Sequence, residues 1–329
     1  MPDIASLVSS LGGIAQKRQL VRLGARDLDL TRAVRSGAVF RARQGWYSTL
    51  DPASDAVRAV RVGGVLTGIS AIRALGGWVL SSPLLHVSVP PNAARLRRAS
   101  NRHLRLNAKA PGNVALHWDA ISVVRRSSPL TVSLEDALIR VIQEETLEVS
   151  VACLDWAVSS GRLDRFSLEA LVLRLPRRFR FISRWVSFEC DSLPESLART
   201  RLRLHGHSVE TQRLLPTGER IDLVVDSAAA IEVDGDEFHR LRFDLDRTKD
   251  MTITLQGLHA LRPTARIVFD DWDRFYDAVR SSLNERGIPP VTQIQDFARI
   301  RDPRSARRRA RHPVGSRKVL NVQSRRSRE

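Results

Sequence analysis

Residues 220–235 decide the fold of this 329-residue chain. They read Arg220-Ile-Asp222-Leu-Val-Val-Asp226-Ser-Ala-Ala-Ala230-Ile-Glu232-Val-Asp234-Gly235. Both β-branched runs carry carboxylates, and an unpaired charge buried beside Val and Ile is very costly. An arginine or a divalent metal can compensate it, and several acids on neighbouring strands favour the metal, because Mg²⁺ prefers oxygen ligands. A metal-dependent hydrolase is therefore the leading hypothesis.

The two runs predict strands at 220–226 and 230–234. Side chains alternate across a strand, so Glu232 and Asp234 lie on one face. The three-residue connection at 227–229 brings Asp222 to the same face, opposite Asp234. Three carboxylates there repel one another and raise the folded-state pKa of at least one of them. A Mg²⁺ or Mn²⁺ ion removes this conflict, so we expect one as the cofactor.

A helix precedes these strands. Ser192-Leu-Pro-Glu195 has the spacing of a capping box with Ser192 as the N-cap, and Gly206 ends the helix. A strand containing Gln212 follows at 209–215. Glu195 has two interpretations: it only caps the helix, or it adds a carboxylate to the acidic site.

Further elements are expected after the acidic strands. A helix begins within 244–250 and runs to about residue 256, where Gly257 ends it. A strand at 258–262 and a closing helix at 272–283 follow. The predicted order is helix, strand, strand, strand, helix, strand, helix.

A series of residues along this region matches a known pattern: Ser192, Glu195, Arg199, Leu202, Gly206, Gln212, Arg220, Asp222, Ile231 to Gly235, His239, Asp246, Arg247, Asp250, Gly257, Leu261 and Arg262. With this series, residues of about 190–283 resemble the endonuclease-like domain related to very-short-patch-repair nucleases, within the PD-(D/E)xK superfamily. The resemblance implies a restriction-endonuclease-like α/β domain with a mixed sheet at 191–285.

The resemblance also implies roles for single residues. Asp222 and Glu232 become metal ligands, the Val233 carbonyl is a possible third, and Glu195 completes the site directly or through water. The superfamily often has a lysine two residues after the second acid, where this chain has Asp234. A histidine can take over water activation, and His239 is the candidate, since imidazole accepts a proton near neutral pH. The alternative for His239 is a structural hydrogen bond.

Three charged residues downstream, Asp246, Arg247 and Asp250, are interpreted as an ion-pair network rather than as catalytic groups.

Residues 1–50 predict three short helices and a hairpin. The helices run from Asp3 to about residue 10, over 16–23 and over 27–35, and strands at 39–43 and 46–48 flank Gln44-Gly45. This is the order of a winged helix-turn-helix, in which the third helix enters the major groove and the wing contacts phosphates. The candidate DNA-binding residues are Thr31, Arg32 and Arg35 on that helix, and Arg41 and Arg43 on the wing.

The N-terminal segment carries a second pattern, formed by Gly13, Gln19-Leu20, Leu23-Gly24, the run Ala33-Val34-Arg35-Ser36-Gly37, Arg41 and Gly45-Trp46-Tyr47. On these residues it resembles the N-terminal domain of the AbiEi family of type IV antitoxins. The resemblance implies DNA binding, and it does not imply toxin neutralisation. The alternative is a module that only mediates protein contacts.

Most of the net charge of +17 lies at the two ends: residues 1–50 carry +5, residues 299–329 carry +10, and the rest of the chain carries +2. Basic ends of this kind suit a polyanion, and DNA is the first candidate. Arginine outnumbers lysine 49 to 4, which we interpret as the coding bias of a GC-rich genome. Two cysteines exclude a disulfide scaffold and a four-cysteine zinc site. We see no signal segment and no membrane span, and expect a soluble cytoplasmic protein.

Residues 55–190 predict an α+β connecting domain that joins the two ends rigidly. A helix is expected at 65–76, strands at 85–89 and 114–118, and a helical stretch from Ser133 to residue 157. His86 and His117 lie on the apolar strands and are interpreted as satisfied core histidines rather than ligands. Residues 299–329 are expected to be a disordered basic tail.

The sequence thus predicts a multi-domain α/β protein that hydrolyses DNA phosphodiester bonds and is targeted by its N-terminal module. Two alternatives stay open. One is a non-catalytic DNA-binding regulator that keeps the nuclease fold for protein contacts or homodimer formation. The other is an antitoxin-like protein with a toxin partner.

Overall fold

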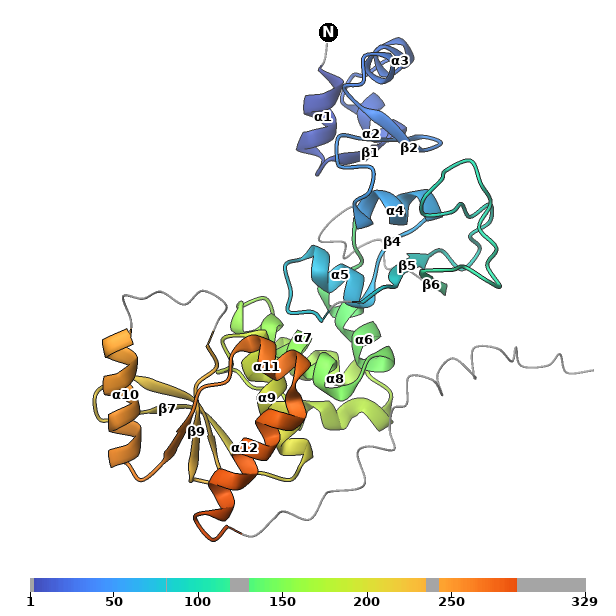
Figure 1. Cartoon of the computed structure of the whole chain (residues 1–329). Helices are drawn as coiled ribbons and strands as arrows, with labels where there is room; N and C mark the ends of the chain where they lie inside the picture. Colours follow the sequence, from blue (N-terminus) through green and yellow to red (C-terminus); the bar gives the residue numbers. More distant parts are fainter. Residues whose placement is uncertain (1–2, 81, 119–129, 235–242, 289–329) are drawn as a thin grey trace, which may run out of the picture.

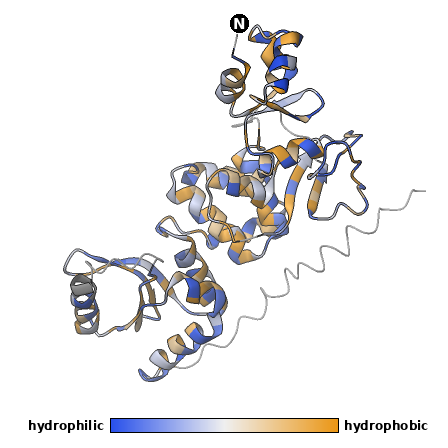
Figure 2. Ribbon diagram, turned by 45° about the horizontal axis from the view of Figure 1, so that its top comes forward, coloured by the Kyte–Doolittle hydropathy of each residue, from blue (hydrophilic) through white to orange (hydrophobic). Residues whose placement is uncertain are grey.

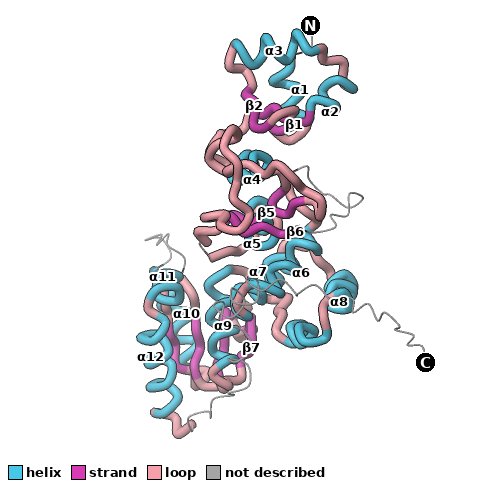
Figure 3. The backbone as a smooth tube through the Cα atoms, turned by 90° about the vertical axis from the view of Figure 1, so that its right-hand side faces the viewer, coloured by secondary structure: helices cyan, strands magenta, loops and turns pink. Residues whose placement is uncertain are grey.

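The structure is a computed structural model that describes residues 3–80, 82–118, 130–234 and 243–288. His239 and the basic tail at 299–329 lie outside these ranges. The described chain is mixed α/β, with three sheets and helices packed on them. Three units follow one another along the molecule, the N-terminal unit at one end and the sheet of β7 to β10 at the other (Figures 1 and 3).

The N-terminal unit has three helices and a three-stranded antiparallel sheet. Its elements are α1 (Ile4–Ser10), β1 (Ile14–Gln16), α2 (Lys17–Arg22), α3 (Asp27–Arg35), β2 (Phe40–Arg43) and β3 (Trp46–Ser48). Asp3 begins α1 as predicted, with its carboxylate accepting from Ala5 N at 3.0 Å. The three helices and the hairpin are confirmed. Strand β1 was not predicted, and it pairs with β3 in the sheet order β1-β3-β2.

The first joint of the molecule connects this sheet to α4 (Asp55–Val62) through Arg43. Its Nη1 donates to the carbonyls of Arg61 and Val62 at 2.7 and 2.8 Å. A cation at the carboxyl end of a helix satisfies carbonyls without partners and complements the helix dipole. Gly63 follows in a left-handed conformation with φ of +117°, and a Cβ there would lie 2.8 Å from Arg43 Nη1.

The central unit is built on a small sheet of β4 (Val65–Leu66), β5 (Leu85–Val89) and β6 (Val114–Trp118), in which β5 runs parallel to β6. Its helices are α5 (Gly68–Ala74), α6 (Leu134–Glu144), α7 (Leu147–Ser159) and α8 (Arg165–Arg174), with a 3-10 helix at Arg177–Arg184. Together they bury the largest apolar cluster of the described chain. Hydrophobic residues gather accordingly in the middle of the molecule (Figure 2).

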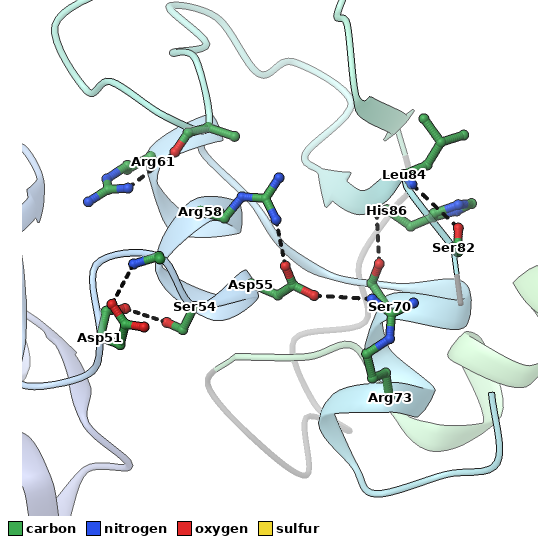
Figure 4. Close-up of polar contacts among 12 residues, drawn as sticks. Asp51, Ser54, Asp55, Arg58, Arg61, Ser70, Arg73, Ser82, Leu84 and His86 are labelled. Carbon is green, nitrogen blue, oxygen red and sulfur yellow. Dashed lines mark hydrogen bonds and ion pairs between the residues drawn. The ribbon is translucent and has the colours of Figure 1, made fainter. Parts of the chain in front are cut away.

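Two predictions for this unit need correction. The expected helix at 65–76 begins only at Gly68, because residues 65–66 pair with β5 instead. The helical stretch from Ser133 is divided into α6 and α7, and Thr146 caps the second helix. Both predicted strands are confirmed. Asp55 ties α4 to α5, since its carboxylate lies 2.7 Å from Arg58 Nη1 and 3.4 Å from Arg73 Nη1 (Figure 4).

The C-terminal unit has a four-stranded mixed sheet of order β10-β9-β8-β7. Its elements are α9 (Leu193–Leu204), β7 (Val209–Leu214), β8 (Arg220–Val225), β9 (Ala229–Ile231), α10 (Phe243–Leu255), β10 (His259–Leu261), α11 (Ala265–Asp270) and α12 (Trp272–Asn284). The predicted order is confirmed, with α11 added. Helix α10 covers one face of the sheet, and α9 and α12 cover the other (Figure 1).

The second joint connects the central unit to α9 through Asp155, which is fully buried on α7. Its carboxylate accepts from Ser187 N at 2.7 Å and from Ser196 Oγ at 2.6 Å. Burial raises the pKa of Asp155 to about 6, although these hydrogen bonds and Arg199 favour the charged form. The helices α7 and α9 are therefore held together by a satisfied polar contact inside an apolar interface.

The first joint yields a stability prediction. Gly63→Ala introduces left-handed strain and displaces the Arg43 guanidinium from its carbonyls. Gly37→Ala is the matched control, because Gly37 also has a positive φ, of +76°, but a Cβ there meets nothing within 4 Å. We expect Gly63→Ala to lower the free energy of unfolding by about 1.5–3 kcal/mol more than the control, the usual worth of charged hydrogen bonds. Equal losses in guanidinium unfolding would refute the role of Arg43.

Candidate functional site

The acidic site begins with the pairing of β8 and β9. Leu223 lies opposite Ile231, so one further step along the ladder sets Asp222 opposite Glu232 rather than opposite Asp234. The predicted register is wrong by two residues because the connection is 226–228, where Asp226 and Ser227 both adopt positive φ. A shift of two leaves the faces unchanged, and directly opposite residues share one face.

The two strands separate just beyond this point. Past Ile231 the chain follows β10, with Glu232 N donating to Leu261 O at 2.9 Å and Asp234 N donating to Pro263 O at 3.0 Å. Asp222 Oδ2 accepts from Val233 N at 2.8 Å. The carboxylate of Asp222 thus takes the place of a strand partner where the ladder opens, which keeps it next to Glu232.

Among the described acids of this unit, Glu232 has the most strongly shifted pKa. Its Oε2 accepts from Lys249 Nζ at 2.5 Å, while Oε1 is buried without a hydrogen-bond partner among the described residues. Burial, followed by the negative charge of Asp222, raises the pKa of Glu232 to about 7, against the opposing effect of Lys249. One ammonium group therefore does not satisfy this pair of acids.

Lys249 was not predicted as a site residue. It lies on α10, and its side chain is only 14% exposed. A signal was available, because Lys249 is one of only four lysines in a chain with 49 arginines. In a chain whose coding bias favours arginine, a lysine indicates a position that needs a compact ammonium group rather than the planar guanidinium group of arginine.

Asp222 and Glu195 extend the acidic group. Burial raises the pKa of Asp222, and the charges of Asp191 and Asp234 act in the same direction. Burial also raises the pKa of Glu195, with the charge of Asp222 adding to it. Asp222 thus interacts electrostatically with both glutamates.

Glu195 also caps its own helix. Ser192 Oγ donates to its Oε1 at 2.6 Å, and Asp191 N donates to its Oε2 at 3.1 Å. Gln212 Nε2 donates to the same Oε2 at 3.4 Å. The two interpretations of Glu195 are therefore compatible, because its carboxylate caps α9 while the charge of Asp222 still raises its pKa.

Asp234 lies in an ion-pair network with Arg262. Arg262 Nε is 2.7 Å from Asp250 Oδ1, and its Nη1 is 3.5 Å from Asp234 Oδ1. The ion-pair interpretation of Asp250 is confirmed, with Arg262 as the partner. The side chain of Asp246, like His239, lies outside the described residues.

The donor set fits a hard divalent cation. Asp222 and Glu232 offer carboxylate oxygens, and the buried Glu232 Oε1 lacks a partner. Within the described ranges, the oxygens of Glu195, Asp222 and Glu232 do not all lie within 4.8 Å of one another. Asp222 on β8 and Glu232, directly after β9, are therefore the acids placed closest together, and Glu195 lies outside this pair.

The candidate DNA-binding residues divide into two groups. Arg32 and Arg35 are exposed on α3, and Arg41 is exposed on β2, 5.7 Å from the centre of the Tyr47 ring. Thr31 Oγ1 donates to Asp27 O within its own helix at 2.9 Å. The prediction that Arg43 binds DNA needs correction, because its guanidinium group donates hydrogen bonds to the carbonyls at the end of α4.

Comparison of the chain with models of known protein families and with curated proteins finds no match. Within the described ranges, none of the helices combines the length and the apolar character that crossing a bilayer requires.

The pKa of Glu232 predicts pH-dependent metal binding. Its folded pKa, about 7, is above the ordinary 4.5, so the protonated form is favoured below pH 7 and competes with a cation. We expect the rise in melting temperature caused by Mn²⁺ to be small at pH 6 and to grow through pH 8. Glu232→Gln should abolish this growth, whereas Glu219→Gln, at an exposed position of the same unit, should keep it. A rise independent of pH would contradict this.

Proposed function

We propose that the chain is a metal-dependent DNA endonuclease whose centre is formed by Asp222, Glu232 and Lys249. The observation that carries the proposal is the buried Oε1 of Glu232, which has no hydrogen-bond partner among the described residues, beside the half-buried carboxylate of Asp222. Two neighbouring carboxylates with a single ammonium group to offset their charge favour the binding of a further cation. The order of elements in the C-terminal unit supports a restriction-endonuclease-like fold of the PD-(D/E)xK type.

The residues have separate tasks in this proposal. Asp222 and Glu232 would hold Mg²⁺ or Mn²⁺, which would supply charge neutralisation at the scissile phosphate and activation of water. Asp222 is kept in place by Val233 N, so its second oxygen is left for the ligand role. Asp234 positions Arg262, which adds positive charge near Glu232.

Lys249 replaces the lysine that the resemblance expects at position 234. It reaches the acid from α10 instead of from the strand, and its ammonium contacts Glu232. A group there can donate hydrogen bonds to a phosphate oxygen or to water as charge develops. Because α10 supplies this ammonium group, the proposal needs no histidine in the same role. The role of His239 stays a prediction.

The N-terminal unit would position the enzyme on DNA. Three helices followed by a hairpin support a winged helix-turn-helix, with Arg32 and Arg35 on the third helix and Arg41 on the wing. The positive charge of both elements would add to affinity for the DNA backbone, and any sequence choice would come from Arg32 and Arg35 on the helix that enters the major groove.

The Lys249–Glu232 ion pair also favours a second candidate, a DNA-binding regulator without catalysis. In that case Lys249 neutralises Glu232 permanently, and the C-terminal unit serves contacts with a second copy or with a toxin. The two candidate functions differ in whether the Lys249–Glu232 ion pair breaks when a metal ion binds.

Plasmid nicking in Mg²⁺ or Mn²⁺ tests the enzyme. Asp222→Asn and Lys249→Ala should each lower the nicking rate by about 10²–10³-fold, the usual cost of one group that stabilises transition-state charge. The matched controls Asp277→Asn and Lys109→Ala change exposed residues and should nick like the unaltered chain. If the unaltered chain does not nick the plasmid, or if Asp222→Asn still nicks it, the enzyme proposal is contradicted and the DNA-binding regulator is favoured.

Salt-dependent DNA binding tests the N-terminal unit separately. The double variant Arg32→Ala, Arg35→Ala should weaken binding and lower the slope of log K against log salt by about 2, one for each lost phosphate contact. Arg274→Ala, Arg280→Ala removes the same charge from α12 and should leave the slope unchanged. Equal effects of both double variants would argue against α3 as the DNA-binding element.

A further inference from the structure

Three chemistry-bearing side chains meet in the central unit, far from the acidic site. They are His86 on β5, His117 on β6 and Glu144, the last residue of α6. His86 Nδ1 lies 3.6 Å from Glu144 Oε2, and His117 Nδ1 lies 3.2 Å from Glu144 Oε1. Among the described residues, this is the set of histidine, cysteine and acidic side chains whose three ligand atoms all lie within 4.8 Å of one another.

Both imidazoles are buried and incompletely satisfied. Their side chains are 7% and 8% exposed. Within the described part of the chain, His86 Nδ1 and His117 Nε2 have no hydrogen-bond partner. The interpretation of these residues as satisfied core histidines is therefore wrong, and a buried nitrogen without a partner normally costs about 1–3 kcal/mol.

The two imidazoles face the same carboxylate from neighbouring strands. Their rings stack with the centroids 5.4 Å apart, and the Nδ1 atom of each ring lies near a different oxygen of Glu144. One cation bound among the three side chains would engage nitrogen and oxygen lone pairs together, which is the arrangement of a metal site.

Arg140 holds the carboxylate of Glu144 from the same helix, with its Nη1 3.0 Å from Glu144 Oε1. Arg140 is thus placed as the outer partner that orients a ligating carboxylate.

We propose that His86, His117 and Glu144 form a binding site for Zn²⁺. Two imidazole nitrogens and one carboxylate suit this ion and leave a fourth position for water. Tetrahedral bonds of about 2.0–2.1 Å set neighbouring ligand atoms about 3.3 Å apart. The separations from Nδ1 to the nearest oxygen of Glu144, 3.2 Å for His117 and 3.6 Å for His86, are close to that spacing, and each is to a different oxygen of the carboxylate.

Gly68 keeps space open beside the site. It begins α5 with φ of +52°, and a Cβ there would lie 3.1 Å from Arg140 Cγ and 3.5 Å from His86 Nδ1. The backbone of His86 is fixed as well, since its N donates to Ser70 Oγ at 3.0 Å (Figure 4). An ion here would join β5, β6 and α6, and would make the central unit a zinc-stabilised element.

The test uses the full-length, untagged chain, stripped with a chelator and titrated with Co²⁺ and then Zn²⁺. We expect one equivalent of Co²⁺ to produce the intense visible absorption of a four-coordinate ion, and Zn²⁺ to displace it. An oxygen-only site with six-coordinate Co²⁺ absorbs only weakly. The strong band therefore distinguishes the proposed site from Co²⁺ bound at Asp222 and Glu232. Absence of the strong band in the unaltered chain overturns the proposal.

Variants assign the signal to its residues. His117→Ala and Glu144→Gln should weaken Zn²⁺ binding by at least about 100-fold, since changes in outer partners alone cost 10–100-fold. His103→Ala and Glu135→Gln alter the same residue types outside the cluster, and Asp222→Asn removes the acidic site. These three should keep the band. Loss of the band in Asp222→Asn, or its retention in Glu144→Gln, would overturn the assignment. If His117→Ala does not fold, Glu144→Gln decides.

Discussion

The contact between Lys249 and Glu232 is the interaction on which the C-terminal unit depends. It lies where β8 and β9 separate, and where the carboxylates of Asp222 and Glu232 stand opposite each other. Asp222 fills the opened ladder through Val233 N, and the ammonium from α10 offsets part of the charge. The buried acids, the split between the strands and the position of α10 are therefore parts of one arrangement.

Two other polar contacts join neighbouring units of the chain. Arg43 fastens the N-terminal sheet to the end of α4, and Asp155 fastens α7 to α9. Each joint places a charged group among backbone or hydroxyl partners, which makes a buried charge tolerable. Residues 55–190 are thus tied to their neighbours by polar contacts at both ends, and their role as a rigid connection stays a prediction.

The central unit contains more than a connection. Its parallel strands carry His86 and His117 toward the end of α6, where Glu144 and Arg140 meet them. The two proposed sites would offer two cations different chemistry, because hard oxygen ligands suit Mg²⁺ and Mn²⁺, whereas imidazole suits Zn²⁺. The two sites need not compete for the same ion.

Local rules in the sequence determined the three N-terminal helices and their hairpin, the strands at 85–89 and 114–118, and the order of elements after Ser192. Capping residues, glycine stops and the period of two act over a few neighbours, and this is why Asp222 and Glu232 were correctly assigned to one face. Only the tertiary structure decided the rest. The partners of Glu232, Arg43 and the two histidines come from distant segments, because packing, which no local pattern encodes, selects which buried charge meets which partner.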